Sequence, residues 1–179
     1  AEDGIRDPLW SRGLGDVYKR QNPYLLFVKI STLFNSNKVF NSISLINLSS
    51  IKDFEEKYDK SVKNRICNIE AMDYTRMGAS IRHLTMLLSK VEAKTKLLIT
   101  LSDGKPDDVD GYRGQYGIED TKKALIEARF LGIHTYCITI DEEAMDYLPY
   151  MYGKNNFAVI NEVGKLPLKV SDIYRKITL

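Results

Sequence analysis

The residues best suited to chemistry follow the stretch Lys96–Leu101, KLLITL, a continuous apolar run that predicts a strand buried on both faces. Asp103 comes two positions after this run, and Gly104 permits a tight turn behind it. In sheets of this kind ligands bind beyond the carboxyl ends of the strands, so the Asp103 carboxylate would point into that crevice. Asp and Gly also favour ordinary turns for local backbone reasons. The motif therefore leaves two interpretations open, a ligand-binding carboxylate and a plain turn.

A second candidate is Thr75, in the segment YTRMGASIRHL just before a predicted helix. Its hydroxyl is suited to capping the first free N–H groups of that helix, which is the more common role. The same oxygen is also a suitable ligand for a hard cation, because Mg²⁺ takes oxygen ligands and keeps several of its waters. Gly78 would let the helix start lie close to a neighbouring loop. Thr75 is thus either a cap or a metal ligand.

An acidic cluster follows the Asp103 turn. It consists of Asp107, Asp108 and Asp110. It does not match a calcium-binding loop, because Pro106 and Gly117 occupy required ligand positions. The cluster indicates either a solvated loop or a loop that recognises a partner.

Asp141 follows the next predicted strand, and is either a second carboxylate near Asp103 or the N-cap of a short helix. His83 and His134 have no Cys or His at metal-binding spacing, which predicts structural roles. The segment GYRGQYG is spaced wrongly for a dinucleotide fingerprint, and no phosphate-binding Gly-x-x-x-x-Gly-Lys occurs. We therefore expect no ATP binding.

Hydrophobic periodicity predicts alternating strands and helices after residue 22. Apolar runs predict strands at residues 24–30, 42–48, 96–101, 133–140 and 157–160. Amphipathic spacing predicts helices at residues 53–69, 77–91, 118–131 and 168–177, and a short helix ending near Gly153. Gly132 would stop the third of these at its C′ position. The alternation predicts an α/β fold: a doubly wound, mostly parallel, Rossmann-like sheet with helices on both faces.

Composition narrows the function classes. A net charge of +2 and a pI near 8.4 do not indicate nucleic-acid binding, and the apolar runs are too short to insert into a membrane. Cys137 lies in a predicted buried strand, where a free thiol is common, so we favour a reducing, cytoplasmic setting over a disulfide with Cys67.

The first 21 residues differ from the remainder. They lack Asn, which is frequent later in the chain, and they show neither helical nor strand periodicity. They resemble translated adapter sequence, and the alternative is a flexible native tail. We expect residues 1–21 to lie outside the fold and residues 22–179 to form a partial domain.

The stretches YTRMGASIRHLTMLL and KLLITLSDGKPDDVDGYRGQYGIEDTKKALIEAR, with GIHTYCITID, resemble a von Willebrand factor A-type (VWA) domain. They are similar in particular to the carboxyl-terminal domain of nitric oxide reductase activation proteins of the NorD and CbbO type. In such domains a metal-ion-dependent adhesion site (MIDAS) is built from an Asp-x-Ser-x-Ser motif, a Thr and an Asp. Thr75 matches the second element and Asp103 the third. The first element is absent, which implies that the domain is N-terminally truncated.

The resemblance implies a protein-binding module and not an enzyme. Mg²⁺ at Thr75 and Asp103 would keep one open position for a carboxylate of a partner protein. It further implies a cytoplasmic accessory protein that, with a MoxR-type AAA+ ATPase, activates a target metalloenzyme, here nitric oxide reductase. The alternative is a Mg²⁺-dependent phosphotransfer or phosphohydrolase enzyme on a similar sheet. Asp103 would then be the nucleophile or a metal ligand, with Lys105 nearby.

Overall fold

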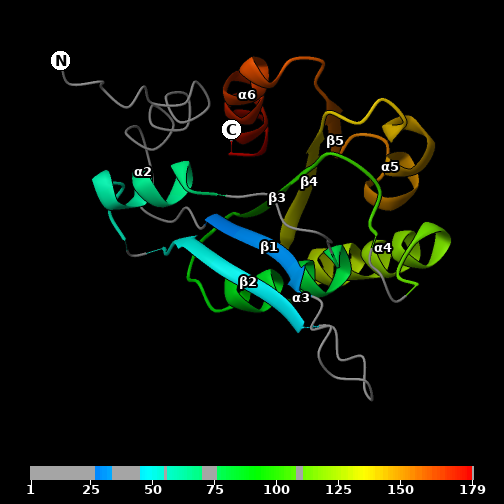
Figure 1. The fold of residues 1–179 in the computed structure, drawn as a ribbon, viewed down its shortest axis with the longest axis horizontal. Coiled ribbons are helices and arrows are strands. Elements are labelled where there is room, and N and C mark those ends of the chain that lie inside the picture. Colours follow the sequence, from blue (N-terminus) through cyan, green and yellow to red (C-terminus); the bar gives the residue numbers. More distant parts are fainter. Residues whose placement is uncertain (1–26, 34–44, 55, 70–75, 108–110, 179) are drawn as a thin grey trace. The chain divides into compact units, whose positions relative to one another are not determined.

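A computed structural model describes residues 27–33, 45–54, 56–69, 76–107 and 111–178 (Figure 1). The chain divides into two compact units. Unit 1 comprises Ala1–Lys29, Ser49–Ala71 and Glu162–Leu179, and unit 2 comprises Ile30–Leu48 and Met72–Asn161. The expected leader, residues 1–21, lies outside the described residues.

Unit 1 has a small apolar core where helix α2 meets the end of strand β2. The core residues are Ile51, Val62 and Ile66, with Tyr58 packed against them. Asp59 caps α2, because its Oδ1 accepts hydrogen bonds from the amides of Ser61 and Val62 at 2.8 and 3.1 Å. The elements with residues in this unit are β1 (Phe27–Leu33), β2 (Leu45–Lys52), α2 (Lys60–Cys67), η1 (Val163–Lys165) and α6 (Leu166–Thr178). Strands β1 and β2 pair in a two-stranded sheet, and each also contributes residues to unit 2.

Unit 2 is built on a sheet whose described strands follow the order β3-β4-β5 and are all parallel. These strands are β3 (Lys96–Ser102), β4 (Ile133–Thr139) and β5 (Phe157–Val159). Lys96 pairs with Ile133 and Ser102 with Thr139, so β3 and β4 end together. Residues that follow these two strands are therefore brought to the same edge of the sheet.

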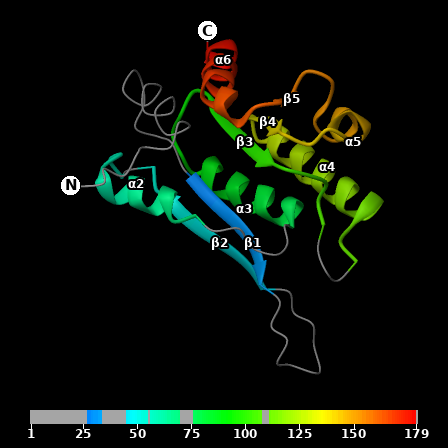
Figure 2. The same cartoon turned by 45° about the horizontal axis from the view of Figure 1, so that its top comes forward.

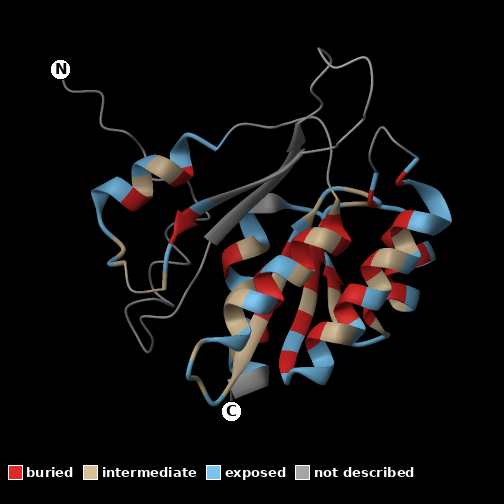
Figure 3. Cartoon of the chain, turned by 90° about the horizontal axis from the view of Figure 1, so that it is seen from below, coloured by how far each residue is buried: buried red, intermediate tan, exposed pale blue. Residues whose placement is uncertain are grey.

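Three helices pack with this sheet: α3 (Met77–Ser89), α4 (Gly114–Phe130) and α5 (Ala144–Tyr152). Helix α4 contacts both α3 and α5, and Figure 2 shows α3 and α4 side by side. The buried face of α4 consists mainly of small residues: Gly117, Thr121, Ala124, Leu125 and Ala128. Figure 3 shows buried residues along these helices and strands of unit 2. Small side chains on α4 allow α3 to approach closely.

The structure confirms the predicted α/β class and its parallel sheet. Gly132 has φ +72 directly after α4, as predicted for a C′ glycine. Helix α4 begins at Gly114, before the predicted start at residue 118, since Gly114 and Gly117 belong to the helix and not to the preceding loop. Gly117 is required by packing and not by a turn, because a Cβ there would lie 2.8 Å from the Pro106 carbonyl oxygen. None of the described helices has both the length and the apolar character needed to cross a membrane.

Candidate functional site

The turn after β3 is closed by Ser102 and not by Asp103. The Ser102 hydroxyl donates to the Gly104 carbonyl oxygen at 2.7 Å and accepts from the Gly104 amide at 3.3 Å. Asp103 itself is exposed, and no group in the described part of the chain donates a hydrogen bond to its carboxylate. The side chain is therefore not used to shape the turn, which leaves its oxygens available to a ligand.

The loop after β4 places a second carboxylate at the same edge, but this one is occupied. Asp141 accepts hydrogen bonds from the Glu143 amide at 2.9 Å and from the Tyr147 hydroxyl at 2.6 Å. The bond from Tyr147 lowers the pKa of the Asp141 carboxyl. Burial, with this bond and the charges of Asp141 and Asp103, raises the pKa of Tyr147. Asp141 thus shapes the turn before α5 but is not the predicted N-cap, because that position is held by Glu143, whose side chain makes no cap hydrogen bond.

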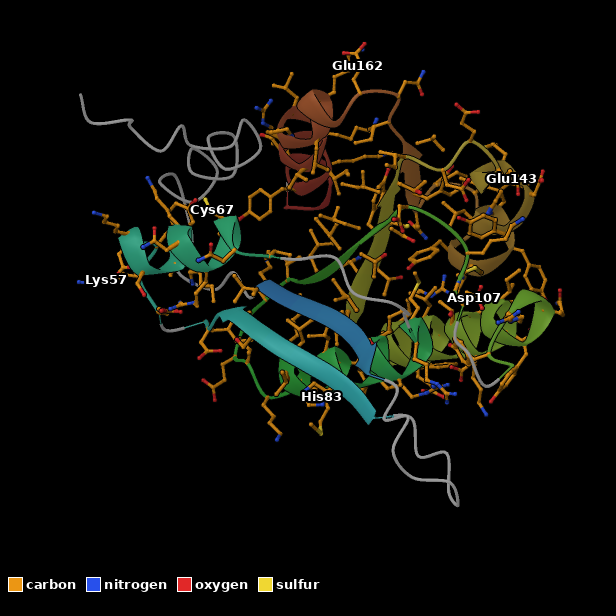
Figure 4. The ribbon with its side chains drawn as sticks, in the orientation of Figure 1. Lys57, Cys67, His83, Asp107, Glu143 and Glu162 are labelled. Carbon is orange, nitrogen blue, oxygen red and sulfur yellow. The ribbon has the colours of Figure 1, made fainter. Side chains whose placement is uncertain are left out.

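Lys105 is also engaged at this edge. Its Nζ lies 2.8 Å from Glu143 Oε2 and 5.6 Å from the centre of the Tyr147 ring. The hydrogen bond with Glu143 raises the pKa of the Lys105 ammonium. Figure 4 labels Glu143, at the start of α5, and Asp107, in the loop after β3. The ammonium therefore bridges the loops that follow the two strands.

Helix α3 begins beside the loop after β3. Its N-cap residue, Arg76, makes no side-chain cap, and the amide of Gly78 instead donates to the Tyr112 hydroxyl at 3.1 Å. This amide belongs to the first turn, where no intrahelical acceptor exists. A Cβ on Gly78 would lie 2.0 Å from Asp120 Oδ2 and 2.9 Å from Tyr112 Oη. The prediction that Gly78 permits close approach to a neighbouring loop is confirmed.

Tyr112 is the residue that sequence reasoning missed. Its side chain is 2% exposed, and its hydroxyl donates to Asp120 Oδ2 at 2.6 Å. Burial and this bond raise the pKa of Tyr112 to about 12. Burial opposes ionisation of Asp120, but hydrogen bonds from Arg82 and Tyr112 outweigh it and lower the pKa of that carboxyl. The only local signal for Tyr112 was an aromatic residue set between glycines in a polar loop.

A second tyrosine joins the same two regions from inside the core. The Tyr152 hydroxyl lies 2.7 Å from Thr100 Oγ1 and 3.7 Å from Met77 Sδ. Thr100 is on β3, three positions before Asp103, and Met77 is the first residue of α3. The start of α3 and the end of β3 are therefore close in space.

The other predicted site residues either lie outside the described residues or are exposed to solvent. Thr75 lies outside the described residues, as do Asp108 and Asp110, so the spacing of Thr75 and Asp103 stays a prediction. Asp107 is exposed and pairs with Arg113 at 3.3 Å, as expected for a solvated loop. His83 and His134 are exposed.

The described residues fit a metal ion only in part. Mg²⁺ prefers oxygen ligands, and the exposed Asp103 carboxylate fits such an ion as one of them. Over the described ranges, no group of three or more His, Cys, Asp or Glu side chains is placed to hold a metal ion. A complete site would therefore need ligands beyond those the structure describes.

Comparison with known proteins gives several curated relatives. The chain is 48% identical over 127 residues to an uncharacterized protein of Pseudomonas aeruginosa, a match covering 71% of this chain and 21% of that protein. It is 39% identical over 132 residues to Protein NorD of Brucella abortus, covering 74% of this chain and 21% of the relative. It is 46% identical over 117 residues to Protein NorD of Stutzerimonas stutzeri, covering 65% and 19%.

The chain spans about a fifth of the length of these curated relatives, so it is homologous to a segment of NorD proteins. No family model matches the chain, and no solved structure gives a significant match.

Proposed function

We propose that this chain is a metal-assisted protein-binding module of an accessory protein that activates nitric oxide reductase. The observation that carries the proposal is the identity of 39% and 46% to two proteins named NorD, over most of this chain. Identity at this level over more than a hundred residues supports a shared role for the segment. The resemblance to nitric oxide reductase activation proteins supplies the nature of that role.

The proposed metal is Mg²⁺, held by Thr75 and Asp103 in a VWA-type site. Its support in the structure is the Asp103 carboxylate, which is exposed and accepts no hydrogen bond within the described residues. A bound Mg²⁺ would supply positive charge and an open coordination position for an acidic side chain of a partner. Asp141 is a weaker candidate ligand, because the Tyr147 hydroxyl and the Glu143 amide already occupy its two oxygens.

The proposed partners are a MoxR-type AAA+ ATPase and the target metalloenzyme, in a cytoplasmic setting. In this arrangement the module binds the ATPase through Mg²⁺, and the ATPase supplies the energy for activating the metalloenzyme.

The phosphotransfer alternative receives less support. Such chemistry needs a basic clamp on the phosphoryl group. Lys105 is the basic residue next to Asp103, and its ammonium bonds Glu143 at 2.8 Å. Incubation with p-nitrophenyl phosphate and Mg²⁺ separates the two functions. Turnover that disappears in an Asp103→Asn variant would favour the enzyme.

The deciding experiment measures binding of the full-length protein to the purified MoxR-type ATPase, with Mg²⁺ and with EDTA. We expect Mg²⁺ to strengthen binding at least tenfold and an Asp103→Ala variant to lose that gain. The matched control is Asp107→Ala, an exposed carboxylate of the same loop, which should bind within twofold of the unmodified protein. Equal binding in Mg²⁺ and EDTA would overturn the metal-assisted proposal.

A second experiment concerns the metal alone. Titration of the 179-residue chain with Mg²⁺ or Mn²⁺ in a calorimeter should give weak binding, because only Thr75 and Asp103 match the family's ligand motifs. A longer chain that also contains an Asp-x-Ser-x-Ser motif should bind clearly. Tight binding by the 179-residue chain would mean that other carboxylates are the ligands, with Asp107, Asp108 and Asp141 tested first.

A further inference from the structure

We infer that Tyr112 is a positioning residue: its hydroxyl couples the loop after β3 to the first turn of α3, so that neither moves without the other. Tyr112 belongs to the loop that begins with Asp103, and its buried hydroxyl contacts Gly78 of α3 and Asp120 of α4. The coupling itself does not depend on a metal. Its consequence for the Asp103 site rests on the proposed function.

The hydroxyl is fixed by both of its hydrogen-bonding roles. It accepts from the Gly78 amide at 3.1 Å and donates to Asp120 Oδ2 at 2.6 Å. The other oxygen of Asp120, Oδ1, forms an ion pair with Arg82 Nη1 at 2.8 Å. Gly78 and Arg82 are one helical turn apart on α3, so the Tyr112–Asp120 pair holds that helix at two points along one face.

The ring of Tyr112 makes contacts of its own. The Arg76 guanidinium lies 5.1 Å from the ring centre, and Tyr116 packs edge-on at 5.2 Å. A Tyr112→Phe variant keeps these ring contacts and removes only the hydroxyl. It leaves the Gly78 amide without its acceptor and removes one of the hydrogen bonds to the Asp120 carboxylate.

This coupling bears on the Asp103 edge because of where its ends lie. Thr75 precedes Gly78 by three positions, and Asp103 opens the loop that Tyr112 closes. The Tyr152 hydroxyl joins Met77 to Thr100 from the core side. The two tyrosines thus fix the start of α3 against the end of β3, which is the spacing that a shared ligand would require.

The test compares two tyrosines that donate to adjacent carboxylates of α4. Tyr112 donates to Asp120 and Tyr150 donates to Glu119, both at 2.6 Å, but Tyr150 is 48% exposed and lies on α5. In ¹⁵N relaxation and amide-exchange measurements, Tyr112→Phe should speed exchange of the Gly78 amide at least tenfold. It should also lower the order parameters of the amides between Asp103 and Asp107. Tyr150→Phe should change neither.

Two outcomes would overturn the coupling. If only Gly78 responds to Tyr112→Phe, the hydroxyl is a local helix cap and the loop is held by other contacts, such as Pro106 on Gly117. If Tyr150→Phe gives the same changes, the effect is general loosening. Asp120→Asn provides a milder variant, since its amide oxygen can still accept a hydrogen bond from Tyr112. The Gly78 amide should therefore exchange almost as slowly as in the unmodified chain.

The consequence for binding is measured separately in the full-length protein. Tyr112→Phe should weaken Mg²⁺-dependent partner binding about tenfold, with Tyr150→Phe unchanged. If Asp103→Ala leaves binding unaffected, the proposed metal function fails, while the relaxation data still decide the coupling. If Asp103→Ala abolishes binding and Tyr112→Phe does not weaken it, the site does not need Tyr112, and its positioning role there is refuted.

Discussion

Replacing Gly78 by alanine should destabilise unit 2, although alanine is the better helix former by about 1 kcal/mol. The new Cβ would lie 2.0 Å from Asp120 Oδ2 and 2.7 Å from its Cγ, too close for any real contact. The carboxylate would have to move away from both the Tyr112 hydroxyl, now at 2.6 Å, and Arg82, now at 2.8 Å. A hydrogen bond to a charged group contributes about 1.5–3 kcal/mol.

The two effects have opposite signs, and the lost hydrogen bonding is the larger. We therefore expect Gly78→Ala to lower the free energy of unfolding by about 1–2 kcal/mol, which corresponds to a fall in Tm of roughly 2–8 °C for a chain of this size. Urea unfolding followed by far-UV circular dichroism suits the chain, because its one tryptophan, Trp10, lies outside the described residues. Gly104→Ala is the control: a Cβ there meets nothing within 4 Å, so the change should stay within about 0.5 kcal/mol.

An Asp120→Ala background tests the cause. It removes the carboxylate atoms nearest the new Cβ, so Gly78→Ala should cost less there, although the Tyr112 hydroxyl would still lie 2.9 Å from that Cβ. The coupling between the two substitutions should be about 0.5–2 kcal/mol. Equal losses in both backgrounds, or no loss in the unmodified chain, would refute the steric argument.

Three further predictions use other parts of the structure. The folded pKa of Asp120 lies below its ordinary value of 3.8, so the contribution of this carboxylate to stability is present above that value and is lost as the pH falls through the folded pKa. The urea midpoints at pH 7 and pH 3 should therefore differ less in Asp120→Asn than in the unmodified chain. Equal differences in the two proteins would contradict this. A thiol reagent at pH 8 should modify the exposed Cys67 rapidly. Burial raises the pKa of Cys137 to about 11, so this thiol should react only after denaturation. Two rapidly reacting thiols per chain would argue against the packing of β4. Gly132→Ala, at φ +72 with open space around it, should lower the free energy of unfolding by about 1–2 kcal/mol, and an unchanged urea midpoint would show that no left-handed backbone is needed there.

Local pattern was sufficient for most of unit 2. The continuous apolar runs of β3 and β4 have few alternatives to a buried strand, and the observed strands, Lys96–Ser102 and Ile133–Thr139, lie close to the predicted ranges. The least accurate strand positions are those of β1 and β2, which continue to Leu33 and Lys52, past the predicted ends at residues 30 and 48. The predicted starts, residues 24–26 and 42–44, lie outside the described residues. The ends of both strands are marked only by polar residues that suit a strand or a loop.

The candidate site was predicted only where its chemistry is local. Asp103 follows a strand directly, so position and residue type together indicated it. The role of Tyr112 depends on Gly78, 34 positions away, and on Asp120 in the next helix. No spacing rule connects such residues, because tertiary packing alone brings them together. Of the two interpretations left open for Asp103, the side-chain turn receives no support from the described residues, because the neighbouring Ser102 hydroxyl closes that turn.

Three tyrosine–carboxylate hydrogen bonds of unit 2 can be compared with one another by vibrational spectroscopy. Tyr112 with Asp120, Tyr147 with Asp141 and Tyr150 with Glu119 all have oxygen–oxygen distances of 2.6 Å. The exposed fractions of the three tyrosines are 2%, 3% and 48%. The donor, the acceptor group and the length are therefore alike while access of water and the neighbouring charges differ, so isotope-edited phenol vibrations of the three residues would report how these surroundings alter one kind of hydrogen bond.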